Sequence, residues 1–165
     1  MKPSTAIFFG MSFLSSLLFG ESKSDSSEKD KWAVAQVTTS DGGTGIFRYM
    51  QVKPEGWKSV PLSEEVSISW KYEGELPNDP TNKRMNELED ALESLSTSKD
   101  SCLALVMTAG GVREWCFYAR DYDAFMKTLN EKLSGKPVFP ISINHSNDSE
   151  WKYWHSFVDT VERKK

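Results

Sequence analysis

The sequence is poor in the residues that build metal sites and nucleic-acid interfaces. Its 165 residues include two histidines and two cysteines, and acidic residues outnumber basic ones by 24 to 20. The net charge of −4 provides no basic excess to neutralise phosphates, so nucleic-acid binding is only a weak alternative. No histidine lies near either cysteine in the sequence, which argues against a zinc site. We therefore expect no metal, no cofactor and no nucleic-acid partner.

The chain also lacks a recognisable catalytic signature. The histidines lie close to acidic residues in a short segment that contains His145, Asp148, Glu150 and His155. Their spacing does not match a ligand pattern such as two histidines at positions i and i+4, and no nucleophile is marked. A hydrolase that uses His145, Asp148 and His155 as acid–base groups is kept as an alternative function. The leading expectation is a protein without catalytic residues.

No apolar run is long enough for an ordinary membrane span. Residues 1–20 begin with the basic Lys2 and continue as an apolar stretch from Thr5 to Phe19, which is shorter than the roughly 20 residues that a span needs. This pattern predicts a signal peptide and a periplasmic or secreted protein with no stable membrane span after cleavage. An uncleaved N-terminal membrane anchor is the alternative. Residues 21–31 are polar and rich in serine, which predicts a flexible linker.

The remaining residues, 32–165, have the composition of one domain and centre on a hairpin. Residues 101–120 contain two apolar runs that meet at Gly110-Gly111, a pair that suits a tight turn. A two-residue turn would place Cys102 opposite Ala119 and Cys116 opposite Leu105, with the thiols on opposite faces. A register shifted by one would bring them to one face, still not directly opposed. We expect two free, buried thiols.

Other elements follow from periodicity and capping signals. Residues 32–39 and 45–52 predict a first hairpin, and residues 66–72 alternate as in a half-buried strand. A helix is expected after an Asp79 cap, and a second one over 122–133 after an Asp121 cap. Residues 138–143 predict a last strand. Pro140 indicates that this strand either lies at the edge of the sheet or starts after the proline. A final helix, capped by Asn147 or Asp148, is expected to run to about Val161.

From residue 66 onward the expected order is strand, helix, hairpin, helix, strand. This order predicts an α+β domain with a ferredoxin-like split βαβ antiparallel sheet. The N-terminal hairpin would extend or cap this sheet. The C-terminal helix must bury its aromatic stripe on a sheet edge or on the open face of the sheet.

Four segments resemble one bacterial family, catalogued as domain of unknown function 695. They are Tyr72-Glu-Gly-Glu-Leu-Pro, Arg84-Met-Asn-Glu-Leu-Glu-Asp-Ala-Leu, residues 105–121 around Gly110-Gly111-Val-Arg-Glu, and Asp148-Ser-Glu-Trp-Lys-Tyr-Trp. The resemblance covers about residues 32–160 and is most specific over the core, 66–157. Some family members are joined to a domain that resembles the regulator of ribonuclease E activity B, so the resemblance implies a ferredoxin-like fold. It implies no catalytic residues.

A protein partner is the expectation that remains. The candidate contact surface consists of residues near the hairpin and at the start of the last helix: Arg113, Glu114, Arg120, Asp148 and Trp151. The acidic side chains of the first helix (Glu87, Glu89, Asp90 and Glu93) form a further candidate face for a basic partner. The tryptophans are expected mainly in the core. We therefore expect an exported protein-interaction or regulatory domain.

Overall fold

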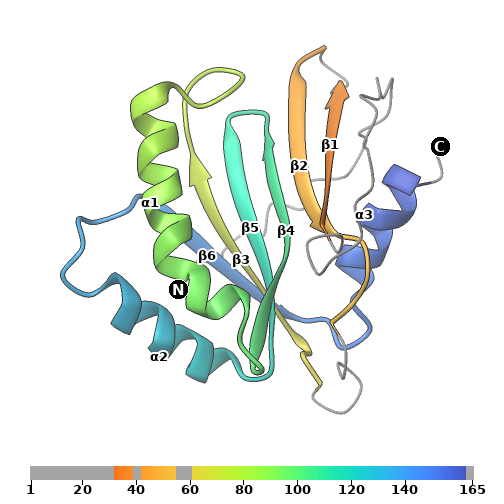
Figure 1. The fold of residues 1–165 in the computed structure, drawn as a ribbon, viewed down its shortest axis with the longest axis vertical. Coiled ribbons are helices and arrows are strands. Elements are labelled where there is room, and N and C mark those ends of the chain that lie inside the picture. Colours follow the sequence, from red (N-terminus) through yellow and green to blue (C-terminus); the bar gives the residue numbers. More distant parts are fainter. Residues whose placement is uncertain (1–31, 39–41, 55–60, 163–165) are drawn as a thin grey trace, which may run out of the picture.

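One antiparallel sheet organises the domain, with helices on both of its faces (Figure 1). The computed structural model describes residues 32–38, 42–54 and 61–162. The predicted signal peptide, 1–20, and linker, 21–31, lie outside the described residues. In chain order the elements are β1 (Trp32–Thr38), β2 (Thr44–Met50), β3 (Glu64–Lys71), α1 (Asp79–Ser96), β4 (Ser101–Ala109), β5 (Val112–Ala119), α2 (Tyr122–Leu133), β6 (Ile141–Asn147) and α3 (Lys152–Glu162).

The strand order is β1-β2-β4-β5-β3-β6, and every neighbouring pair is antiparallel. The α+β prediction is therefore confirmed. From β3 to β6 the elements follow the predicted order of strand, helix, hairpin, helix and strand. The first hairpin extends the sheet, because β2 pairs with β4 along residues 46–49.

Two hydrophobic clusters cover the two faces. On the front face, α1 and α2 bury Leu88, Leu92 and Phe125 against Ile68 and Trp115 of the sheet. On the back face, α3 buries its aromatic stripe among side chains of β1, β2, β4 and β5. The last helix thus packs on the open face rather than at a sheet edge (Figure 1). No helix within the described ranges combines the length and apolar character that crossing a bilayer requires.

Several predicted elements are confirmed, and in others a cap or a boundary lies a few residues away from the predicted position. The helix 122–133 and its Asp121 cap agree, and Asp121 accepts the N–H of Ala124. The cap of α1 is Asn78, not Asp79, because the Asn78 side chain accepts the N–H of Thr81 at 3.0 Å. The last strand begins after Pro140, at Ile141, and continues to Asn147 by pairing with β3. It forms the edge of the sheet, as that proline indicated.

The prediction for the cysteine faces is wrong, and a bulge explains why. The register follows the predicted pairing from Ala109↔Val112 to Leu105↔Cys116 and then shifts between Leu103 and Leu105. Cys102 is consequently opposite Tyr118 instead of Ala119. Both cysteines belong to the back-face cluster. They are nevertheless free and buried, as predicted.

Candidate functional site

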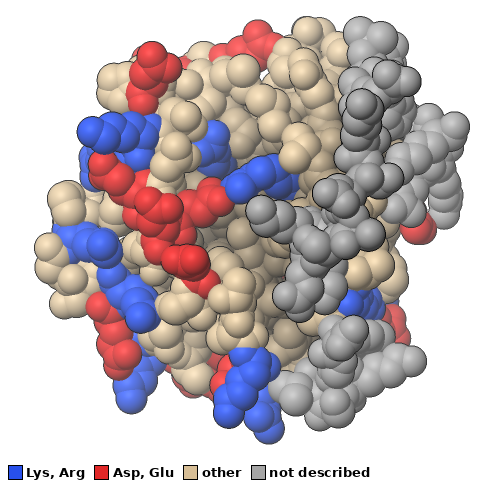
Figure 2. Space-filling view, viewed as in Figure 1, with Lys and Arg blue, Asp and Glu red and all other residues tan. Residues whose placement is uncertain are grey.

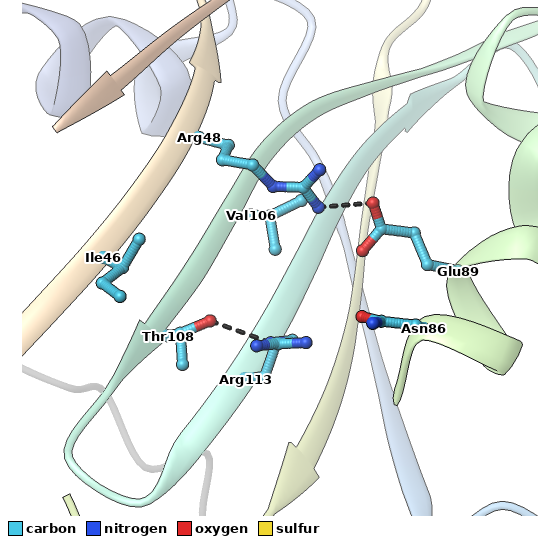
Figure 3. A pocket seen from close by; sticks show the side chains of 7 residues that line it. All are labelled: Ile46, Arg48, Asn86, Glu89, Val106, Thr108 and Arg113. Carbon is cyan, nitrogen blue, oxygen red and sulfur yellow. Dashed lines mark hydrogen bonds and ion pairs between the residues drawn. The ribbon is translucent and has the colours of Figure 1, made fainter. Parts of the chain in front are cut away.

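A groove opens on the front face between α1 and β2 (Figure 3). Its volume is about 250 Å³, and β4 and β5 form its floor. Seven residues from four elements line it, and we call this set the front groove: Ile46, Arg48, Asn86, Glu89, Val106, Thr108 and Arg113.

The sheet register brings the strand residues of the front groove together. Ile46 pairs with Thr108, and Thr108 pairs in turn with Arg113 on β5. Directly opposed residues of antiparallel strands place their side chains on the same face, so these three point to the front. Arg48 lies two residues beyond Ile46 on β2 and therefore shares that face. On α1, Asn86 and Glu89 are three residues apart and lie on one side of the helix.

Hydrogen bonds and an ion pair fix the charged side chains of the groove. Arg48 forms an ion pair with Glu89 across the opening (Figure 3). The other oxygen of Glu89, Oε2, accepts the indole N–H of the buried Trp115 at 3.0 Å. Glu89 therefore links β2, α1 and β5 through two separate contacts.

Arg113 is held from both sides of the groove. Its Nε donates to Oγ1 of Thr108 at 2.9 Å, and its Nη2 donates to Oδ1 of Asn82 at 2.9 Å. Burial lowers the pKa of the Arg113 guanidinium, the nearby Glu89 carboxylate opposes that shift, and the Arg48 charge adds to it. An arginine remains protonated in proteins despite such a shift. The groove thus carries two positive side chains and one negative side chain.

Exposed apolar side chains continue the front surface beyond the groove. Trp32 and Val34 of β1 are 40% and 70% exposed, and Ile46 of β2 is 37% exposed. Trp32 pairs with Met50 and Val34 pairs with Arg48, so both side chains lie on the face that bears Arg48. The front groove and this apolar border form one surface that combines charged and apolar side chains. Among the described residues no group of three potential metal ligands occurs.

The comparison with protein families identifies the chain. The sequence model of a family of unknown function, DUF695, matches residues 30–158. The chain belongs to the DUF695 family. No curated protein matches the chain. The family predicted from the hairpin and helix motifs is therefore confirmed.

In this DUF695 chain the predicted contact residues lie on different surfaces. Arg113 lines the front groove, whereas Glu114 faces the back and accepts a hydrogen bond from Tyr153 at 3.0 Å. Arg120 is exposed and pairs with Asp100 at 3.7 Å.

The other two predicted contact residues, Asp148 and Trp151, belong to the start of α3. Asp148 accepts the backbone N–H groups of Lys152 and Tyr153, at 2.8 and 3.0 Å, so it caps the helix as predicted. Its Oδ2 also accepts the hydroxyl of Tyr118 at 2.7 Å. Trp151 is fully buried, and its ring stacks on that of Tyr118 at 3.9 Å. Both residues therefore anchor α3 to the sheet.

The residues of the alternative hydrolase site make contacts with different elements. His145 lies 2.5 Å from Glu64 and stacks on the ring of Tyr122 from α2. Asp148 serves as the α3 cap, and His155 borders the ring of Trp154 on that helix. His145 pairs with Val66, whose side chain is in the front cluster, while α3 covers the back. The sheet thus separates His145 from the α3 residues.

Sequence reasoning missed Arg48 and the particular position of Glu89. In the sequence Glu89 is indistinguishable from Glu87, Asp90 and Glu93, yet it is half-buried whereas those three are exposed. Figure 2 shows acidic side chains gathered over α1, next to a basic side chain on the side of the sheet. The signal available in the sequence was an arginine within an alternating strand, but its partner could be named only from the packing of α1 against the sheet.

Proposed function

We propose that this DUF695 protein is an exported, non-catalytic interaction domain that binds a partner protein through its front surface. The binding surface comprises the front groove and its apolar border on β1 and β2. One observation supports this proposal most directly. The exposed side chains of Trp32, Val34 and Ile46 lie on the same face of the sheet as the Arg48–Glu89 ion pair. Aromatic, aliphatic and arginine side chains in one patch are typical of protein interfaces.

The charge distribution favours a partner segment that combines apolar and basic side chains. The groove itself has a small positive excess, but α1 adds the exposed acidic residues Glu87, Asp90 and Glu93 beside it. The apolar border would accept aliphatic or aromatic side chains, and the acidic face of α1 would attract lysine or arginine next to them. The same acidic face would repel the phosphates of nucleic acids.

Export is the second part of the proposal. It rests on the apolar stretch from Thr5 to Phe19 behind the basic Lys2, which has the length and order of a signal peptide. The test is fractionation of cells that express the full chain, followed by N-terminal sequencing of the protein recovered. A new N-terminus near residue 20 in the periplasm or medium supports export. Retention of Met1 in the membrane fraction supports the anchored alternative.

Site-specific photocrosslinking tests the binding surface. A photoreactive phenylalanine analogue replaces Ile46 in the native host, and the control replaces the exposed Asn130 on α2, away from the groove. We expect a discrete adduct with one partner at position 46, none at position 130, and a weaker adduct when Arg48→Ala is added. Equal labelling at both positions, or no adduct at position 46, would contradict the proposal.

A further inference from the structure

The outermost strand, β1, has a free pairing edge among the described residues. It lies at one end of the sheet, and its only strand partner in the described part of the chain is β2. The pairing with β2 is regular over all seven residues, from Trp32↔Met50 to Thr38↔Thr44, without a bulge. A regular end strand presents a row of backbone N–H and C=O groups that can template another strand.

The sequence of β1 contains none of the usual protections of an edge strand. Residues 32–38 read Trp-Ala-Val-Ala-Gln-Val-Thr, with no charged residue and no proline. The opposite edge, β6, differs: Pro140 directly precedes it, and its exposed residues include Ser142, Asn144 and His145. Natural sheets usually protect long edges with lysine, proline or bulges. Within β6 there is likewise no proline and no acidic, lysine or arginine residue, so the two edges differ mainly in their exposed side chains, which are polar on β6 and include Trp32 and Val34 on β1.

The side chains of β1 also differ between its two faces. On the back face, Ala33, Ala35 and Val37 pack with the cluster that α3 completes. On the front face, Val34 is 70% exposed and Trp32 is 40% exposed. A strand added beside β1 would bring neighbouring side chains onto that front face and cover part of this apolar area.

We propose that β1 pairs in antiparallel fashion with β1 of a second copy of this chain, forming a two-fold symmetric dimer. In an antiparallel pair, directly opposed residues have side chains on the same face of the sheet. A symmetric register that uses all seven residues of β1 therefore pairs Trp32 with Thr38 and Val34 with Gln36 of the second copy. Ala35 lies at the centre of this pairing. The two Val34 side chains then lie diagonally adjacent beside the symmetry axis and cover each other. Val34, the most exposed apolar residue of the strand, is thus in diagonal contact with its own copy on the front face, while Ala35 faces its own copy on the back face.

The charge pattern is what favours a second copy as the occupant. In a symmetric pair, a charged residue near the centre of the strand would face or adjoin its own copy and repel it. The seven residues of β1 carry no charge, so self-pairing meets no such opposition. The dimer joins the two sheets into one continuous sheet. Its axis runs perpendicular to the sheet, so both front grooves face the same side and can bind a two-fold partner.

Sedimentation equilibrium of the protein purified after expression of the full chain tests the proposal. We expect the wild type to have the mass of two chains, and Val34→Lys to have the mass of one, with an unchanged circular dichroism spectrum. Val138→Lys is the matched control: Val138 is 89% exposed between α2 and β6, so this variant should remain a dimer. A monomeric wild type over a wide concentration range, or a dimeric Val34→Lys, overturns the proposal.

Chemical crosslinking keeps the proposal testable if the lysine variant does not fold. Val34→Cys treated with a short bis-maleimide reagent should yield a crosslinked dimer, whereas Val138→Cys should not. The native Cys102 and Cys116 are buried and should not contribute. An absence of crosslinked dimer at position 34, or equal crosslinking at both positions, rejects pairing through β1. Because these tests need no partner protein, their outcome is independent of the proposed function of the groove.

Discussion

The indole N–H of Trp115 donates to Oε2 of Glu89 at 3.0 Å, and this bond joins the central strand β5 to α1. Trp115 is fully buried, so its N–H depends on this protein acceptor. The same carboxylate holds Arg48 from β2 with its other oxygen. Glu89 therefore accepts a hydrogen bond from the buried Trp115 beneath the groove and forms an ion pair with Arg48 at the surface of the groove.

Replacing Glu89 should separate these two contacts. Glu89→Ala leaves the buried indole N–H without an acceptor and should lower the free energy of unfolding by about 1–3 kcal/mol. Glu89→Gln retains an acceptor oxygen and loses the partly exposed ion pair, which should cost only about 0–1 kcal/mol. Urea denaturation of both variants measures the difference. Equal losses would show that the Trp115 bond contributes nothing beyond the ion pair.

Glycine substitutions in the central hairpin should differ by position. Gly110 and Gly111 both have positive φ, +57° and +75°, so alanine at either should cost about 1–2 kcal/mol. At Gly111 a Cβ would also lie 3.0 Å from the carbonyl oxygen of Tyr72, whereas at Gly110 it would meet open space. Gly111→Ala should therefore destabilise the protein more than Gly110→Ala, as thermal unfolding would measure. The opposite order would contradict this account of the turn.

The stability should depend on pH through Glu114. Burial raises the pKa of this carboxyl, the nearby Glu65 adds to the rise, and the hydrogen bond from Tyr153 opposes it. Because the folded-state pKa is the higher one, the folded state holds the proton longer, and stability falls as pH rises from the ordinary value of 4.5 through the raised value. Glu114→Gln keeps an acceptor for Tyr153 and removes the buried charge.

We expect Glu114→Gln to be more stable than the wild type at pH 7 and equal to it below about pH 4, where the unfolded-state carboxyl is also protonated. Denaturation at a series of pH values measures both limits. Glu131→Gln, at an exposed position on α2, is the control and should show no comparable gain. A loss of stability in Glu114→Gln at pH 7 would mean that the ionised carboxylate is favourable in the folded state.

The two thiols should be unreactive in the folded protein. Burial raises the pKa of Cys102 to about 12 and raises that of Cys116 well above its ordinary value, so neither forms the reactive thiolate near neutral pH. An aromatic disulfide reagent should detect no thiol in the native protein and two thiols after unfolding in urea. No thiol after unfolding would indicate a disulfide, and rapid reaction in the native protein would indicate exposure.

Local sequence patterns were enough to predict most of the elements. The helix 122–133 follows from the spacing of Phe125 and Leu129 and from the Asp121 cap, which all lie within neighbouring turns. The central turn follows from Gly110-Gly111, because positive φ is a property of the residue itself. The α+β class follows from the order of such elements. These features depend on contacts between residues that are close in the sequence.

The candidate site depended on contacts between distant residues. Arg48 and Glu89 are 41 positions apart, and only the pairing of β2 with β4 and the packing of α1 place them together. The bulge between Leu103 and Leu105 reversed the expected face of Cys102, because a shift of one residue in register exchanges the faces of a strand. Arg113 and Glu114 illustrate the opposite case: alternation along β5 already implied that they face different sides.

The sequence by itself determined the family, most of the elements, the Asp121 cap of α2 and the central turn, because periodicity, side-chain capping and glycine conformation act within a few residues. Only the tertiary structure decided which face each helix covers, which arginine meets Glu89 and which strand lies at the end of the sheet that the described residues form. Those outcomes depend on how the sheet as a whole buries its apolar faces, and no short segment carries that information.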